Sequence, residues 1–202
     1  MPGHRHFILN KPFGYLCQFV CELPKKKLVG SLYDFPDGTM AIGRLDEHSE
    51  GLLLLTTDGQ VSEYIRSRKI EKEYYAQLDG LITDEAIEQM KQGVEIGIRD
   101  VKYRTKSCKV FKLDTDPGFA PRTRKIRDDR HGPTSWVSVT LTEGKYRQVR
   151  KMTAAAGFPT LRLVRVRIGN ILLGDLKPGE VKEVDRFEIS GPEVDTENDS
   201  VI

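Results

Sequence analysis

The feature that most constrains this chain is a run of four leucines, Leu52 to Leu55, enclosed by glycines in the segment GRLDEHSEGLLLLTTDG (residues 43–59). Such a run is too short for the three turns of a typical helix, so it predicts a strand buried on both faces. The polar turn before it then lies at a strand end, where a fold can hold a side chain rigidly and still leave it accessible. Asp46 occupies that turn, between Arg44 and Glu47.

A carboxylate in this position is a candidate nucleophile or general base, with Arg44 as a candidate partner. The alternative is that Asp46 only forms or caps the turn, which is the commoner role of an aspartate there. The residues of the turn, taken by themselves, leave both readings open.

The rest of the chain alternates between short strand patterns and a few helical ones. We predict further strands over residues 7–10, 72–78, 94–98, 101–113, 136–142, 161–168, 181–184 and 187–189. We predict helices over residues 28–35, 60–67, 83–92 and 147–156, with Thr83 as the cap of the third. Strands outnumber helices and several are neighbours in sequence, which predicts an α+β fold with a mixed, mostly antiparallel sheet and flanking helices.

The length of 202 residues fits one domain, which we place at residues 1–190. Residues 191–202 carry four acids and no base, and we expect them to form a disordered acidic tail. The remainder is therefore more basic than the net charge of +2 suggests.

Basic residues gather in one window of the chain. Between Gly144 and Gly174 there are seven of them and no acid, namely Lys145, Arg147, Arg150, Lys151, Arg162, Arg165 and Arg167. Such a window favours a polyanionic partner, with nucleic acid favoured over a membrane surface. A further segment, Asp114–Pro133, is rich in proline and basic residues and predicts a long loop, which is typically functional or disordered.

Several classes of protein are disfavoured by what the sequence lacks. No apolar run approaches the roughly 20 residues that cross a bilayer, and the N-terminus does not resemble a signal peptide. The cysteines, Cys17, Cys21 and Cys108, are odd in number and lack metal-site spacing, so we expect reduced thiols in a cytoplasmic protein. We find no dinucleotide or phosphate loop and no metal-ligand cluster, and expect neither cofactor nor metal.

Two further segments place polar residues where they could contact a ligand. On a strand, Lys72 and Tyr74 share a face, so Tyr74 rather than Tyr75 would point into a cleft, where its ring could stack on a base. The alternative is a half-buried strand tyrosine. On the helix at 147–156, Arg147, Arg150 and Lys151 are spaced to form one basic face that could bind phosphate or a carboxylate, or simply a cationic surface.

These segments together resemble the RsuA/RluE-type pseudouridine synthases. The resemblance is carried by G-R-L-D with E-G-L-L-L-L-T-x-D-G (residues 43–59), K-x-Y (72–74), E-G-x-x-x-Q-V-R (143–150) and L-x-R-x-x-I-G (163–169). It extends from Phe7 to about Val184. Within the family, P-T-S-W (133–136) and M-T-A (152–154) resemble the branch of the large-subunit enzyme E. Lys151 stands where the family often has a second arginine.

The resemblance implies the pseudouridine synthase catalytic fold, without the S4 RNA-binding domain that many relatives carry. It implies that Asp46 is catalytic, that Arg150 pairs with it, and that Tyr74 and Leu163 flank the target base. Arg44, Lys72, Arg147, Lys151 and Arg165 are then expected to bind RNA. The expected substrate is one uridine of ribosomal RNA. We expect this RNA to be the 23S RNA of the large subunit, with small-subunit RNA as the alternative. The enzyme is expected to act as a monomer without a cofactor.

Two other functions stay open. A non-catalytic RNA-binding or ribosome-assembly factor on the same fold would use the same basic window, whereas an N-glycosylase would release the base to water. The intact G-R-L-D, K-x-Y and Q-V-R segments favour the synthase.

Overall fold

The computed structural model describes residues 3–20, 25–67, 69–126 and 129–189. Cys21 and the expected acidic tail at 191–202 lie outside the described residues. Cys17 and Cys108 are free thiols.

The strands are β1 (His6–Lys11), β2 (Tyr15–Leu16), β3 (Lys27–Leu28), β4 (Met40–Ile42), β5 (Glu50–Thr56), β6 (Lys72–Asp79), β7 (Glu95–Ile98), β8 (Val101–Arg104), β9 (Lys109–Leu113), β10 (Thr134–Leu141), β11 (Thr160–Ile168), β12 (Ile171–Leu172) and β13 (Val181–Val184). The helices are η1 (Val29–Ser31), α1 (Gly59–Ser67), α2 (Asp84–Gln92), η2 (Asp129–His131) and α3 (Gln148–Ala155).

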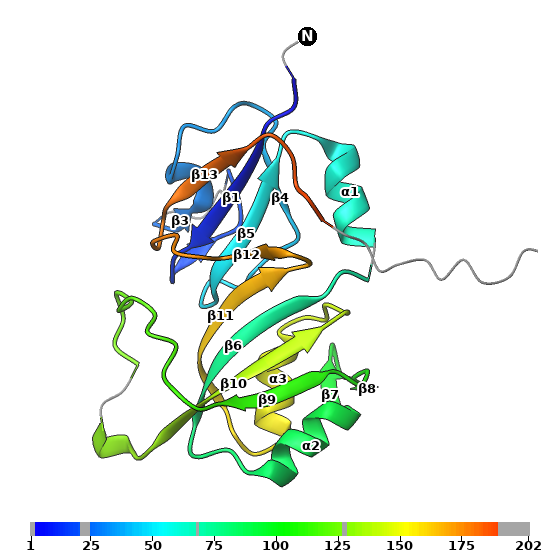
Figure 1. Cartoon of the computed structure of the whole chain (residues 1–202), viewed down its shortest axis with the longest axis vertical. Helices are drawn as coiled ribbons and strands as arrows, with labels where there is room; N and C mark the ends of the chain where they lie inside the picture. Colours follow the sequence, from blue (N-terminus) through cyan, green and yellow to red (C-terminus); the bar gives the residue numbers. More distant parts are fainter. Residues whose placement is uncertain (1–2, 21–24, 68, 127–128, 190–202) are drawn as a thin grey trace, which may run out of the picture.

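Nine strands form one long twisted sheet, ordered β13-β1-β5-β11-β6-β10-β9, with β4 paired to β5 and β12 to β11. Within this sheet the β5–β11 pair is parallel and the other pairs are antiparallel, which confirms the mixed, mostly antiparallel sheet and the α+β class. The parallel pair joins two halves of the molecule, and α2 and α3 lie against the half built from β6, β9 and β10 (Figure 1).

The junction between the halves depends on Gly51, which pairs with Arg165 of β11. Gly51 has a φ of +99°, and a Cβ there would stand 2.3 Å from the Arg165 carbonyl oxygen and 2.8 Å from its amide nitrogen. Only glycine allows the two strands to come this close with that backbone conformation. The turn that holds Asp46 ends directly before this crossing.

The four leucines of β5 are fully buried, as their run predicts. Leu53 and Leu55 pack with the apolar side chains of β1, and Leu52 and Leu54 pack on the opposite face with residues of α1 and β11. A strand covered on both faces is a rigid support for the turn that precedes it.

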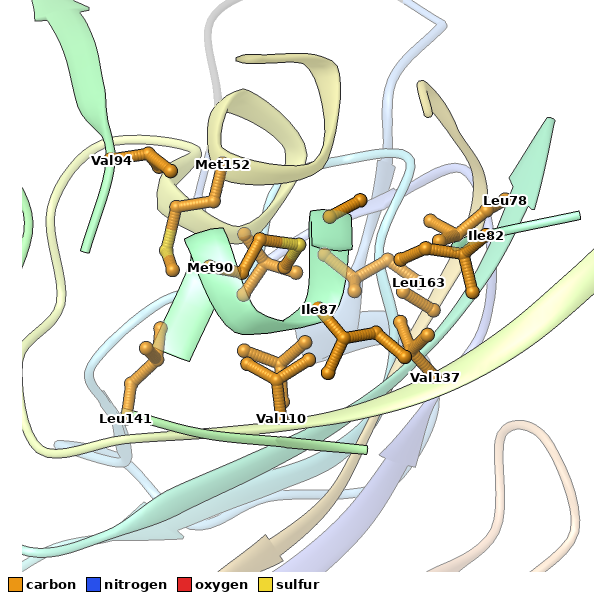
Figure 2. Packing of buried hydrophobic residues seen from close by; sticks show 14 of the residues in the cluster. Leu78, Ile82, Ile87, Met90, Val94, Val110, Val137, Leu141, Met152 and Leu163 are labelled. Atoms are coloured by element: carbon orange, nitrogen blue, oxygen red, sulfur yellow. The ribbon is translucent and has the colours of Figure 1, made fainter. Parts of the chain in front are cut away.

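The largest core cluster lies between the helices and the other half of the sheet. In Figure 2, Ile87 and Met90 of α2 and Met152 of α3 face Val110, Val137 and Leu141 of the neighbouring strands. Thr83 caps α2 by accepting a hydrogen bond from the Ala86 amide at 3.2 Å, which confirms the predicted helix start. This packing fixes α3, whose first residues face the turn that carries Asp46.

Three predicted elements are wrong. The strand expected at 101–113 is two strands in different sheets, because Thr105 turns the chain by bonding Val94 through both its amide and its hydroxyl oxygen. The helix expected at 28–35 is a single 3-10 turn. Residues 187–189 form no strand, and the Phe187 ring instead lies 5.2 Å from that of His6.

Candidate active site

The turn that carries Asp46 connects two antiparallel strands, β4 and β5. Its ends are held by the buried strand pairing, and the Asp46 carbonyl accepts a hydrogen bond from the Ser49 amide at 3.0 Å. The neighbouring Leu45 is buried, whereas the Asp46 side chain keeps 25% of its surface exposed. The carboxylate is therefore held in place and still reachable.

A fully buried lysine, Lys11, holds this turn in place through hydrogen bonds to its backbone. The Lys11 ammonium donates to the carbonyl oxygens of Ser49 at 2.7 Å, Pro12 at 3.1 Å and Glu47 at 3.3 Å. Burial lowers its pKa to about 8, against the opposing charges of the nearby acidic groups. Lys11 was not singled out from the sequence, because a lysine that follows Asn10 at the end of a strand is normally exposed.

Five of the predicted residues line one pocket: Arg44, Asp46, Tyr74, Arg147 and Leu163. Its volume is ≈ 70 Å³, well below the roughly 300–1,000 Å³ of ordinary ligand sites. The predicted residues therefore meet around one small hollow.

Tyr74, and not Tyr75, faces this pocket, as strand alternation predicts. Tyr75 points to the opposite face of the sheet, where its ring lies 6.1 Å from that of Phe119. Leu163 pairs with Ala76 beside Tyr74 and is 5% exposed, so it belongs both to the core and to the pocket wall. The pocket thus has an aromatic and an aliphatic wall near a carboxylate.

Arg147, and not Arg150, makes the ion pair with Asp46, at 3.7 Å between Nη1 and Oδ2. Arg147 precedes α3 in a left-handed conformation with a φ of 52°, so its side chain leaves the helix in its own direction. The ion pair expected between Arg150 and Asp46 is therefore wrong for this structure.

Arg150 instead reaches the backbone of the turn that carries Asp46. Its guanidinium donates to the His48 carbonyl at 2.9 Å and to the Thr160 carbonyl at 3.3 Å. Burial lowers the pKa of Arg150, and the charge of Arg147 adds to this while that of Asp46 opposes it. Arg150 thus ties the turn to β11.

The expected single basic face of α3 is also not formed. Lys151 donates to the Gly97 carbonyl and lies 5.2 Å from the centre of the Tyr146 ring, outside the pocket. Because Arg147 is outside the helix, the three cations point to three different places. Lys72 and Arg165 line a second hollow next to the pocket.

Regular strand alternation would place Arg165 and Arg167 on one face of β11, but a bulge prevents this. The register shifts between these two residues, so Arg165 pairs with Tyr74 but Arg167 pairs with Glu73. Arg167 consequently turns to the other face of the sheet, where it donates to the Glu73 carboxylate at 2.8 Å.

Glu143 and Gln148 shape the pocket entrance and were not singled out from the sequence. The Gln148 amide donates to Glu143 at 2.6 Å, and the Tyr103 hydroxyl donates to the same carboxylate at 2.6 Å. Burial alone would raise the pKa of Glu143, but these bonds and one from the Lys106 amide hold it below its usual value. The fixed spacing of the two residues in E-G-x-x-x-Q was the available signal.

Among the described residues no cluster of histidine, cysteine or acidic side chains is arranged to hold a metal ion. In that same part of the chain, no helix has the length and apolar character needed to cross a membrane.

Comparison with known proteins gives consistent matches. A family described as RNA pseudouridylate synthase matches residues 5–155. The chain is 41% identical over 186 residues to a ribosomal large subunit pseudouridine synthase E of Vibrio parahaemolyticus, covering 91% of this chain and 75% of the relative. It is 36% identical over 193 residues to the ribosomal small subunit pseudouridine synthase A of Escherichia coli, covering 93% and 74%.

A crystal structure of a pseudouridylate synthase matches with a TM-score of 0.72 and 29% identity, over 91% of this chain and 71% of that one. The family match over most of the length, the identity to curated relatives and the shared fold agree with the site around Asp46. The chain belongs to the RNA pseudouridylate synthase family.

Proposed function

We propose that this synthase converts one uridine of large-subunit ribosomal RNA into pseudouridine, with Asp46 as the catalytic carboxylate. The observation that carries the proposal is the pocket that Asp46 lines together with the aromatic ring of Tyr74 and the aliphatic side chain of Leu163. Several relatives at 38–41% identity are large-subunit enzymes, which supports that substrate over small-subunit RNA.

The reaction is an isomerisation and needs no redox partner. The bond from the ribose C1′ to N1 of the base breaks, the base turns, and C1′ bonds to C5, which loses a proton while N1 gains one. A carboxylate beside the ribose and base can attack either of them or take a sugar proton. Of the two carboxylates that line the pocket, Glu143 accepts hydrogen bonds from Tyr103 and Gln148, so we assign this role to Asp46.

The remaining pocket residues position the nucleotide. The target base must leave its stack at a cost of a few kcal/mol, and Tyr74 offers a replacement stacking surface. Arg147, now paired with Asp46, must withdraw as the base enters and is then free to bind a phosphate. Arg150 acts differently, because its bonds to the turn and to β11 hold Asp46 in position. Arg44, exposed at the rim, contacts the RNA.

We further infer that the enzyme acts as a monomer in the cytoplasm. Lys151 contributes to RNA affinity only weakly in this proposal, since it lies outside the pocket.

The decisive experiment is Asp46→Asn. We expect pseudouridine formation to fall by roughly 10³-fold or more, while folding and RNA binding persist. The other carboxylate that lines the pocket, Glu143, is held by hydrogen bonds from Tyr103, Gln148 and the Lys106 amide and is not free to replace Asp46. Carbodiimide mapping of large- and small-subunit RNA transcripts treated with purified protein measures the modification and identifies the substrate.

Glu47→Gln is the matched control, since the Glu47 carboxylate is in the same turn but pairs with Lys26 at 2.9 Å. It should modify RNA like the wild type. Turnover retained by Asp46→Asn would refute the catalytic assignment, and modification of small-subunit RNA alone would refute the proposed substrate.

A further inference from the structure

A second hollow, with a volume of ≈ 410 Å³, adjoins the catalytic pocket and shares Arg44, Tyr74, Glu143 and Gly144 with it. We call it the basic groove. Its charged lining consists of six basic residues and one acid: Arg44, Arg66, Lys69, Lys72, Lys106, Arg165 and Glu143. An RNA strand with one nucleotide in the catalytic pocket would place its neighbouring nucleotide in the basic groove.

Arg165 lies in the wall of this groove with an unbalanced charge. It is 3% exposed, and its Nε donates a hydrogen bond to the Leu52 carbonyl at 2.7 Å. Its Nη2 is buried without a hydrogen-bond partner. No carboxylate of the described residues lies within salt-bridge distance of it. A buried guanidinium whose Nη2 group lacks a partner is costly unless an anion completes it.

The same strand shows how the fold treats arginines that serve structure. Arg162 donates two hydrogen bonds to Glu50, at 2.8 and 3.1 Å, and Arg167 is paired with both Glu71 and Glu73. Arg165 is the arginine of β11 that faces the basic groove, and it is the one without a carboxylate. Among the described residues, the lack of a carboxylate partner is therefore specific to Arg165 and is not shared by the other two arginines of β11.

Lys72 adds a second cation to the same wall. Its ammonium donates to the Ile70 carbonyl at 3.0 Å, which leaves two of its three donors for a ligand. Burial lowers the pKa of Lys72, and the charge of Arg165 lowers it further, so the two cations repel each other. An anion bound between them would relieve both effects.

We propose that Lys72 and Arg165 form a binding site for a phosphodiester of the RNA strand next to the target uridine. The proposal rests on the proposed function, which brings that uridine to Asp46. Tyr74 stands between the two hollows, so its ring faces the base while the neighbouring phosphate enters the groove. Arg66, Lys69 and Lys106 extend the positive surface along which the strand continues.

Lys72→Met tests the site, with a fluorescein-labelled 12-nucleotide oligouridylate as the RNA. Fluorescence anisotropy at several salt concentrations should show about tenfold weaker binding. It should also show a log K against log salt slope shallower by about 0.7, the value for one lost contact to a single strand. Lys91→Met is the control, because Lys91 lies on α2, outside both hollows, and pairs with Glu88. It should leave affinity and slope unchanged.

Lys72→Arg keeps the charge and should retain the wild-type slope, which separates a lost phosphate contact from a disturbed fold. Wild-type affinity and slope in Lys72→Met would overturn the proposal, as would an equal loss in Lys72→Arg. Titration with inorganic phosphate should show no tight binding. Tight binding of inorganic phosphate that Lys72→Met abolishes would instead assign the site to a free anion.

The two proposals fail separately. Asp46→Asn should bind the oligouridylate with the wild-type slope, since its change lies outside the phosphate site. Turnover by Asp46→Asn would refute the catalytic assignment and leave the phosphate site standing. An unchanged slope in Lys72→Met would refute the phosphate site and leave the synthase standing.

Discussion

The two faces of the sheet at β11 treat the same kind of side chain in opposite ways. On one face, which we call the closed face, Arg162 and Arg167 are neutralised by carboxylates. On the other, the open face, Arg165 lines a basic groove and has no carboxylate partner among the described residues. A paired, buried arginine holds the fold together, whereas an unpaired one beside a hollow is available to a ligand. Ion pairing therefore distinguishes cations that serve the fold from cations left available to a ligand better than residue type does.

The largest expected effect, on stability, comes from removing a carboxylate that neutralises an arginine of the closed face. Glu50→Gln removes the partner of Arg162, whose side chain is 8% exposed, and leaves a buried charge unpaired. We expect the free energy of unfolding to fall by about 3–5 kcal/mol. Chemical denaturation measures this, and RNA affinity of the folded fraction should not change.

Glu183→Gln is the matched control, because its partner Arg5 forms the pair at the surface. Its stability should stay close to that of the wild type. If Glu50→Gln is as stable as the wild type, the ion pair of Arg162 does not stabilise the fold, and the distinction between a structural closed face and a ligand-binding open face is wrong.

Lys11 sharpens the comparison, since it is buried like the closed-face arginines but is bound by three backbone carbonyls. Its pKa in the folded protein is about 8, below the unfolded value of 10.5. Between these values the unfolded chain binds more protons, so the Lys11 contribution to stability rises with pH from about 8 to 10.5. The shift corresponds to about 3 kcal/mol.

Lys11→Met should lack this pH-dependent contribution. Urea denaturation of both proteins at pH 7.5, 9 and 10 compares them, and the wild type should gain stability relative to the variant as the pH rises. Parallel curves for the two proteins would show that Lys11 is not held at a lowered pKa.

The smallest of these effects distinguishes two arginines near Asp46. Arg150→Ala frees the turn that carries Asp46 from β11, and if Asp46 reacts as proposed, a displacement of about 1 Å costs about 10²-fold in rate. Arg147→Ala removes the ion pair but leaves the turn braced, so it should mainly weaken RNA binding. Single-turnover rates and anisotropy titrations separate the two.

The reverse pattern, with a rate loss in Arg147→Ala and none in Arg150→Ala, would contradict the structural assignment. It would also show that charge next to Asp46 matters more for the reaction than the position of the turn.

Much of the site was predictable because its signals are local. The buried β5 follows from four consecutive leucines, and the pocket-facing side chain of Tyr74 follows from strand alternation. The Thr83 cap follows from its position before an amphipathic segment. Each of these features depends on a few adjacent residues, so it could be predicted without knowing which residues from other parts of the chain lie nearby.

The errors arose where one local irregularity changed a periodic pattern. A helix drawn from Arg147 places it beside Arg150, but the left-handed conformation of Arg147 directs it to Asp46 instead. Regular alternation places Arg165 and Arg167 together, but the bulge separates them. Neither irregularity has a clear signature in the residues themselves.

By itself, the sequence determined the buried strand, the turn with its aspartate, the order of the motifs and the excess of positive charge, because composition and short spacing decide all four. Only the tertiary structure decided which arginine meets Asp46, which cations are neutralised and which stay open. Those outcomes depend on the close crossing at Gly51, the bulge in β11 and the burial of Lys11. All three bring together residues that are far apart in the chain.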